Sequence, residues 1–119
     1  MLRRFLPVED PPMLFELRIY EILPGRMDAI MNRFSQHTMR IFERLDIEVV
    51  GFWQEVVGRS DRLVYITRFE SQADREAKWT AFQSDPEWLQ VRAETEASGQ
   101  IVARVINSYM TPTGFSPMQ

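Results

Sequence analysis

The stretch Val49–Phe69 constrains the fold most, because it reads as two strands that are apolar on both sides, joined at Gly58-Arg59-Ser60-Asp61. Successive side chains of a strand point to opposite faces of a sheet. In the first strand this alternation predicts Val50, Phe52 and Val56 on one face and Val49, Trp53 and Val57 on the other. In the second strand it predicts Leu63, Tyr65 and Phe69 opposite Val64 and Ile66. A chain this short covers one face of a sheet with its own helices, so the other face requires a partner.

Length and composition indicate one globular domain and exclude several functional classes. The 119 residues suffice for a single core, and contents of 45% hydrophobic and 26% charged residues are ordinary. A net charge of −3 without a basic run argues against nucleic-acid binding. The absence of cysteine excludes disulfides and thiol chemistry. No apolar stretch approaches the ~20 residues that span a bilayer, so we expect no membrane segment. A cytoplasmic location fits the absence of cysteine.

The chain divides into an N-terminal arm over residues 1–12, which ends in Pro11-Pro12, and a single domain over residues 13–117. The patterns predict strand 13–22, helix 26–45, the hairpin 49–69, a helical region from Ser71 to about Ser98 that is interrupted at Asp85-Pro86, and strand 101–110. Ser71 and Asp85 are the expected N-caps. The solvent side of helix 26–45 is expected to carry Asn32, Arg33, Gln36, Arg40 and Glu43.

This β-α-β-β-α-β order is that of the ferredoxin-like α+β fold. Right-handed crossovers then give a four-stranded antiparallel sheet with the first and third strands at its centre and the helices on one face. Whichever face is bare, a large apolar group such as Phe52 or Trp53 lies on it. We therefore expect a homodimer in which two sheets meet face to face and close a shared, barrel-like core.

Several short motifs, taken in their order and spacing, resemble those of the NIPSNAP family. They are Phe15-Glu16-Leu17-Arg18-Ile19-Tyr20, Pro24-Gly25, Gly51-Phe52-Trp53, Gly58, Arg75, Asp85-Pro86-Glu87-Trp88 and Phe115-Ser116-Pro117. The resemblance covers about residues 13–117. It implies a dimeric α+β barrel, in a superfamily that also holds cofactor-free monooxygenases, stress-responsive barrel proteins and haem-binding relatives. It implies no single reaction, because a fold does not determine a function.

His37 is the only side chain whose ordinary pKa lies near neutrality, and it falls one helical turn from Phe34 and Ile41. Such a group could carry a proton at a pocket between helix and sheet. The favoured interpretation is simpler: a histidine at the border of the apolar face that is hydrogen-bonded to backbone. No carboxylate accompanies it at helical spacing, as a catalytic pair would require.

Glu16, Arg18 and Tyr20 form a polar stripe along an expected central strand, and Arg68 lies on the adjacent one. Buried charges must be paired, so the favoured interpretation is a set of ion pairs that fixes sheet register or dimer orientation. The alternative is a clamp for an anion or a carbonyl group. In that case Arg18 or Arg68 would bind an acidic ligand and Tyr20 would orient it.

The large aromatic residues Trp53, Tyr65, Trp79 and Trp88 are interpreted as core and interface anchors rather than as a cage for a planar ligand. One histidine, no cysteine and no acidic cluster leave too few ligands for a metal. No glycine-rich phosphate loop is present either. The sequence therefore predicts neither a metal nor a cofactor.

Three hypotheses for function follow. The first is a dimeric barrel protein that binds a small apolar or aromatic ligand in a cavity between sheet and helices. Its candidate binding residues are Arg18, Trp53, Tyr65 and Arg68. The second is a cofactor-independent monooxygenase or isomerase, in which His37 and Tyr20 act as catalytic residues in a dry pocket. The third is a structural or partner-binding module.

Overall fold

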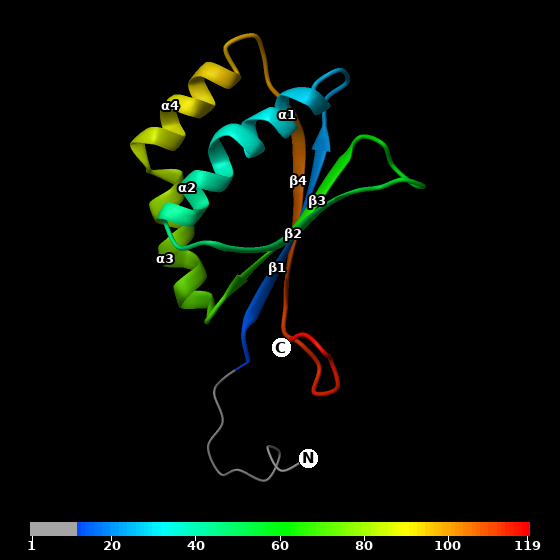
Figure 1. Cartoon of the computed structure of the whole chain (residues 1–119), viewed down its shortest axis with the longest axis vertical. Coiled ribbons are helices and arrows are strands. Elements are labelled where there is room, and N and C mark those ends of the chain that lie inside the picture. Colours follow the sequence, from blue (N-terminus) through cyan, green and yellow to red (C-terminus); the bar gives the residue numbers. More distant parts are fainter. Residues whose placement is uncertain (1–11) are drawn as a thin grey trace.

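Residues 12–119 are described by a computed structural model, in which the helices lie on one side of a single sheet (Figure 1). The elements follow in the order β1 (Leu14–Ile22), α1 (Met27–Arg33), η2 (Phe34–Thr38), α2 (Met39–Arg44), β2 (Glu48–Gln54), β3 (Arg62–Phe69), α3 (Gln72–Gln83), α4 (Pro86–Thr95) and β4 (Val102–Met110). The arm predicted over residues 1–12 falls outside the described residues, apart from Pro12.

The sheet has the strand order β2-β3-β1-β4, and every neighbouring pair is antiparallel. β1 and β3 therefore occupy the centre, while β2 and β4 are the edges. The helices cover one face (Figure 1), as right-handed crossovers require. The predicted ferredoxin-like α+β fold is confirmed.

The helix-facing side of the central strands combines apolar and charged groups. It carries Glu16, Arg18 and Tyr20 of β1, which pair in register with Thr67, Tyr65 and Leu63 of β3. The polar stripe thus lies inside the chain, between sheet and helices. The alternate side chains Phe15, Leu17 and Ile19 point to the other face, as the alternation of a strand requires.

The alternation predicted for the first strand of the hairpin is wrong in two places. A β-bulge between Val49 and Gly51 brings Val49 onto the same side as Phe52, and both pack against the core. The strand also ends earlier than expected. Val56 and Val57 therefore lie in the connection to β3, where they are 99% and 94% exposed.

The predicted helix starts after the hairpin are confirmed. The Ser71 side chain caps α3 by accepting from the N–H of Asp74 at 3.0 Å. The Asp85 carboxylate caps α4 by accepting from the N–H of Trp88 at 3.0 Å, and Pro86 occupies the first helical position. These caps fix where the side chains of α3 and α4 meet the sheet.

The long helix predicted over residues 26–45 is continuous but contains a π-helical turn, η2, between α1 and α2. The N–H of Met39 donates to the carbonyl of Phe34, five residues earlier. The hydroxyl of Thr38 donates to the carbonyl of Arg33 at 3.2 Å. Turns of this kind are rare and often occur at functional sites.

Aromatic rings fill much of the space between sheet and helices. Phe34 lies against Phe52 and Tyr65, with ring centroids 4.9 and 5.4 Å apart. Phe82 of α3 stacks on Trp88 of α4 at 4.6 Å. Such pairs contribute about 0.5–1.5 kcal/mol beyond the burial of their area, so they help to hold the helices in place.

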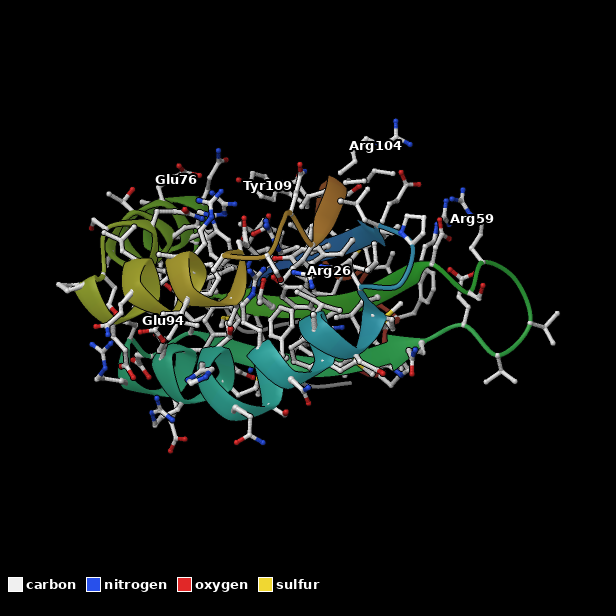
Figure 2. The ribbon with its side chains drawn as sticks, turned by 90° about the horizontal axis from the view of Figure 1, so that it is seen from above. Arg26, Arg59, Glu76, Glu94, Arg104 and Tyr109 are labelled. Carbon is white, nitrogen blue, oxygen red and sulfur yellow. The ribbon has the colours of Figure 1, made fainter. Side chains whose placement is uncertain are left out.

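The opposite face of the sheet carries no helix among residues 12–119 and is largely apolar. Its side chains include Leu17, Ile19, Val64, Ile66, Trp53, Ile106 and Met110. The indole of Trp53 lies over Gly51, where an added Cβ would be 3.0 Å from the ring, so a larger residue there would require the indole to shift. Beyond the sheet, the β2–β3 connection that carries Arg59 extends away from the rest of the chain (Figures 1 and 2).

Candidate ligand-binding site

The carboxylate of Glu16 accepts four hydrogen bonds at the helix-facing side of the sheet. Arg75 of α3 donates two of them, from Nε at 2.9 Å and from Nη2 at 3.0 Å. Arg18 Nη1 and Asn107 Nδ2 each donate at 2.9 Å. Glu16 is fully buried. Removing a charge from water costs several kcal/mol, so these donors make the buried carboxylate possible.

The surroundings of Glu16 keep it ionised. Burial alone would raise the pKa of Glu16, because it disfavours the charged form. The hydrogen bonds from Arg75 and Asn107 and the charge of Arg18 outweigh burial, so the pKa of Glu16 lies below its ordinary value of 4.5. Burial likewise opposes the charge of Arg75, yet its bonds to Glu16 raise the pKa of this arginine.

The lowered pKa of Glu16 predicts an acid-sensitive fold. Ionised Glu16 stabilises the folded chain fully above about pH 4.5, and this stabilisation is lost as the pH falls through the lower folded-state pKa. We expect the free energy of unfolding, measured with urea between pH 7 and pH 3, to fall more steeply below pH 4.5 in the wild type than in Glu16→Gln. If the free energy of unfolding fell equally steeply with pH in the two proteins, a lowered pKa of Glu16 would be contradicted.

A chain of hydroxyl groups leads from Arg18 to Tyr20. Arg18 Nε donates to the hydroxyl of Tyr65 at 2.9 Å, and the hydroxyls of Tyr65 and Tyr20 are 2.8 Å apart. Burial raises the pKa of Tyr65 well above its ordinary value, so this phenol keeps its hydrogen. Arg18 has no acceptor atom, so the hydroxyl of Tyr65 donates its hydrogen to the hydroxyl oxygen of Tyr20. In that arrangement no residue among 12–119 accepts the hydroxyl hydrogen of Tyr20.

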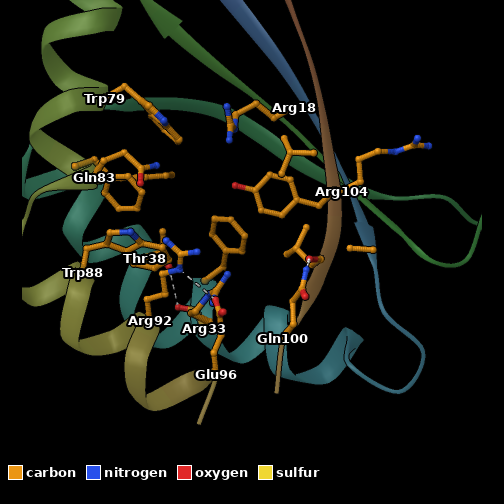
Figure 3. Close-up of a pocket in the computed structure, with 17 residues that line it drawn as sticks. Arg18, Arg33, Thr38, Trp79, Gln83, Trp88, Arg92, Glu96, Gln100 and Arg104 are labelled. Carbon is orange, nitrogen blue, oxygen red and sulfur yellow. Dashed lines mark hydrogen bonds and ion pairs between the residues drawn. The ribbon is translucent and has the colours of Figure 1, made fainter. Parts of the chain in front are cut away.

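A pocket of about 580 Å³ lies beside Tyr20, between the helices and the edge strand β4 (Figure 3). Its wall holds six aromatic residues, Tyr20, Phe34, Phe42, Trp79, Phe82 and Trp88. It also holds four arginines and one carboxylate, Arg18, Arg33, Arg92, Arg104 and Glu96. Figure 3 shows Arg18 beside Trp79 at one end, and Arg33, Arg92 and Glu96 together at the other. The volume and the lining are those of a small-molecule site.

The pocket is open because the helices leave the edge strand β4 largely uncovered. Val105, which lines the pocket, is 39% exposed, and Tyr109 on the same face is 41% exposed. The hydroxyl of Tyr109 donates to Glu76 of α3 at 3.2 Å, which links strand and helix (Figure 2). The opposite wall is supplied in part by the π-helical turn, through Phe34 and Thr38.

The profile of the NIPSNAP family matches residues 15–117, nearly the whole chain. This chain belongs to the NIPSNAP family. The match confirms the resemblance seen in the sequence motifs. No curated protein matches the chain.

Solved structures of other NIPSNAP proteins are similar to this one in fold. A NIPSNAP family protein of unknown function from Agrobacterium tumefaciens is 25% identical with a TM-score of 0.80, and the match covers 91% of this chain and 95% of that one. A second protein from the same bacterium is 20% identical with a TM-score of 0.81, covering 90% and 99%. An uncharacterised NIPSNAP-like domain protein from Burkholderia xenovorans is 22% identical with a TM-score of 0.78, covering 88% and 89%.

The predicted site residues of this NIPSNAP domain are not all brought together. Arg18 and Tyr20 line the pocket, and Tyr65 lies behind them, within hydrogen-bond distance of both. His37 lines a different hollow of about 190 Å³. The structure therefore does not place His37 and Tyr20 in one pocket.

Trp53 and Arg68 lie on the uncovered side of the sheet, away from the pocket. Arg68 contacts Glu48 at 3.4 Å and donates to the carbonyl of Gln119 at 2.7 Å. The indole of Trp53 lies over Gly51. These two predicted binding residues thus belong to a different surface from Arg18.

Three residues of this pocket were not predicted from the sequence, namely Arg33, Arg92 and Glu96. Arg33 was expected on the solvent side of its helix, but it is 6% exposed and lines the pocket. One signal was available, because Arg33 lies three positions after Ile30 and so shares its helix face. Arg75 lies one helical turn before Trp79, a spacing that by itself predicts only a cation–π contact between them. That contact exists at 5.3 Å, but the same guanidinium also binds Glu16.

Across residues 12–119, none of the helices combines the length and the apolar character needed to cross a membrane. Within the same part of the chain, no three side chains of His, Cys, Asp or Glu gather as the ligands of a metal ion would.

Proposed function

We propose that this NIPSNAP protein binds a small apolar or aromatic ligand in the pocket between its helices and its sheet. The observation that carries the proposal is a pocket of about 580 Å³ with six aromatic residues in its wall. Small-molecule sites are typically apolar and aromatic, with a few polar groups that orient the ligand. Here Arg18 and Tyr20 supply such groups, and the network around Glu16 and Tyr65 holds both of them in place.

The three tryptophans allow a direct test of ligand binding. Trp79 and Trp88 line the pocket, whereas Trp53 lies on the other face of the sheet. In Trp53→Phe, all tryptophan fluorescence therefore comes from the pocket wall. We expect saturable quenching, with a rise in melting temperature, for at least one class among quinones, polyphenols and fatty acids.

The matched control is the double variant Trp79→Phe/Trp88→Phe, which retains only Trp53. Its fluorescence should not respond to the same ligand. An equal response would show that the ligand binds elsewhere, and no response of Trp53→Phe to any of the three classes would overturn the proposal.

An enzymatic reaction has less support than binding alone. A cofactor-independent monooxygenase or isomerase needs a proton-accepting group in the pocket, the role predicted for His37 alongside Tyr20. Of these two residues only Tyr20 lines the large pocket. A purely structural module, in turn, would be expected to have a solid interior, and the pocket argues against that reading.

We also propose that the protein is a cytoplasmic homodimer, whose subunits pair through the uncovered face of the sheet. Leu17, Ile19 and Ile106 lie side by side on this face. Soluble monomers rarely expose large apolar patches. A two-fold axis would cover the face with the same face of a second copy. A chain without cysteine is compatible with a reducing cytoplasm.

A further inference from the structure

The charged groups at the wall of the pocket are mostly cations. Arg18, Arg33 and Arg92 contribute three positive charges and Glu96 contributes one negative charge, whereas the guanidinium of Arg104 points away from the pocket, across β4 (Figure 3). Arg18 shares Glu16 with Arg75, which also contacts Glu76, so these two arginines are matched by two carboxylates outside the wall. The unbalanced positive charge therefore lies at Arg33 and Arg92.

Arg33 and Arg92 share the single carboxylate of Glu96. Arg33 Nη1 lies 2.9 Å from it, and Arg92 Nε lies 3.5 Å from it. Two cations beside one anion leave an excess of one positive charge at this end of the pocket (Figure 3). The side chain of Arg33 is only 7% exposed, and water screens its charge less than that of a surface arginine.

Hydrogen-bond donors without acceptors occur at the same end. The Nε–H of Arg33 and the Nε1–H of Trp88 are buried, and no described residue accepts from either. The guanidinium carbon of Arg33 lies 5.1 Å from the centre of the Trp88 ring, so the two side chains that carry these donors are neighbours. A buried donor without an acceptor is unfavourable, and a small rotation of either side chain toward a ligand oxygen would relieve this. The hydroxyl hydrogen of Tyr20 adds a further donor.

We infer that the ligand of this pocket is an organic carboxylate with a flat, apolar body, bound with its carboxylate at Arg33 and Arg92 and its body against the aromatic wall. The inference rests on the proposed function and names the class of ligand. A carboxylate supplies acceptors and a negative charge, which are what this end of the pocket lacks. Guanidinium groups also match the planar, two-oxygen geometry of a carboxylate.

Pairs of compounds that differ in charge but hardly in shape test whether the negative charge of the ligand contributes to binding. We expect 2-naphthoate and cinnamate, titrated calorimetrically into the full-length protein at neutral pH, to bind at least about tenfold more tightly than 2-naphthamide and cinnamamide. Each amide has nearly the same shape as its carboxylate but no charge. Arg92→Gln should reduce this preference about tenfold, because it removes the positive charge that only the carboxylates match, and it should weaken amide binding much less. The side chain of Arg92 is 56% exposed, so the variant is expected to fold.

Arg40→Gln is the control for a general effect of charge. It removes the same charge from an arginine that is 59% exposed on α2 and is absent from the pocket wall. It should leave the preference for carboxylates unchanged. Carboxylates and amides that bind equally would overturn the inference and leave the proposed function standing. If none of the four compounds binds, the inference fails, and the fluorescence test with quinones, polyphenols and fatty acids decides separately on the proposed function.

Discussion

Glu16→Gln is expected to lower the free energy of unfolding by about 3–5 kcal/mol, the range found when one partner of a buried ion pair is removed. The substitution keeps the shape of the side chain, but it places an amide NH₂ among donors. Arg18 and Arg75 would stay charged without their shared carboxylate. Because domains of this size are stable by only about 5–15 kcal/mol, the loss should be large in urea denaturation. The proteins should be compared at one concentration, because association affects apparent stability.

Glu76→Gln is the matched control for this prediction. Glu76 also contacts Arg75, at 3.2 Å, but its side chain is 56% exposed. Exposed ion pairs contribute about 0–1 kcal/mol, so this variant should differ little from the wild type. If both variants lost a similar amount of unfolding free energy, the burial of Glu16 would not be the cause of the loss.

Phe52 and Trp53 are neighbours in β2 that face opposite sides of the sheet, so aspartate at each position should give a different result. Phe52→Asp places a charge against Phe34 and Tyr65, whose ring centroids lie 4.9 and 4.7 Å from that of Phe52. We expect a loss of several kcal/mol, enough to unfold the chain. Trp53→Asp alters only the uncovered face. We expect it to give a folded chain of 14.1 kDa in light scattering, whereas the wild type should scatter with twice this mass.

The conservative variant Trp53→Phe should keep the mass of the wild type, because it retains an apolar ring on the same face. A wild-type protein that remains at 14.1 kDa at high concentration would overturn the homodimer. A folded Phe52→Asp protein would contradict the assignment of Phe52 to the core. Circular dichroism of each variant separates loss of fold from loss of association.

The faces of β1 were predictable from sequence because strict alternation places Glu16, Arg18 and Tyr20 together. The faces of β2 were not, because Val49 and Val50 are both apolar and a bulge has no residue pattern of its own. Either valine fits the core equally well by composition. The pairing with β3 decides between them.

The polar stripe of β1 was recognised in the sequence, but its binding partners were not. Arg75 and Asn107 are 59 and 91 residues away from Glu16 along the chain. They meet it only because α3 packs on the sheet and β4 pairs with β1. Arg33 and Arg92 likewise converge through the packing of α1 against α4, a contact that no periodicity within either helix predicts.

The π-helical turn η2 sets the direction of every side chain that follows it in the long helix. Side chains advance by about 100° per residue in an α-helix, so Phe34 and Phe42 would point about 80° apart if the helix were regular. One surplus residue in the turn rotates the following segment back by about 100°, and both rings meet at 6.4 Å. A relative whose helix lacks this residue would need its apolar positions after Thr38 shifted by one place to present the same side of α2 to the sheet.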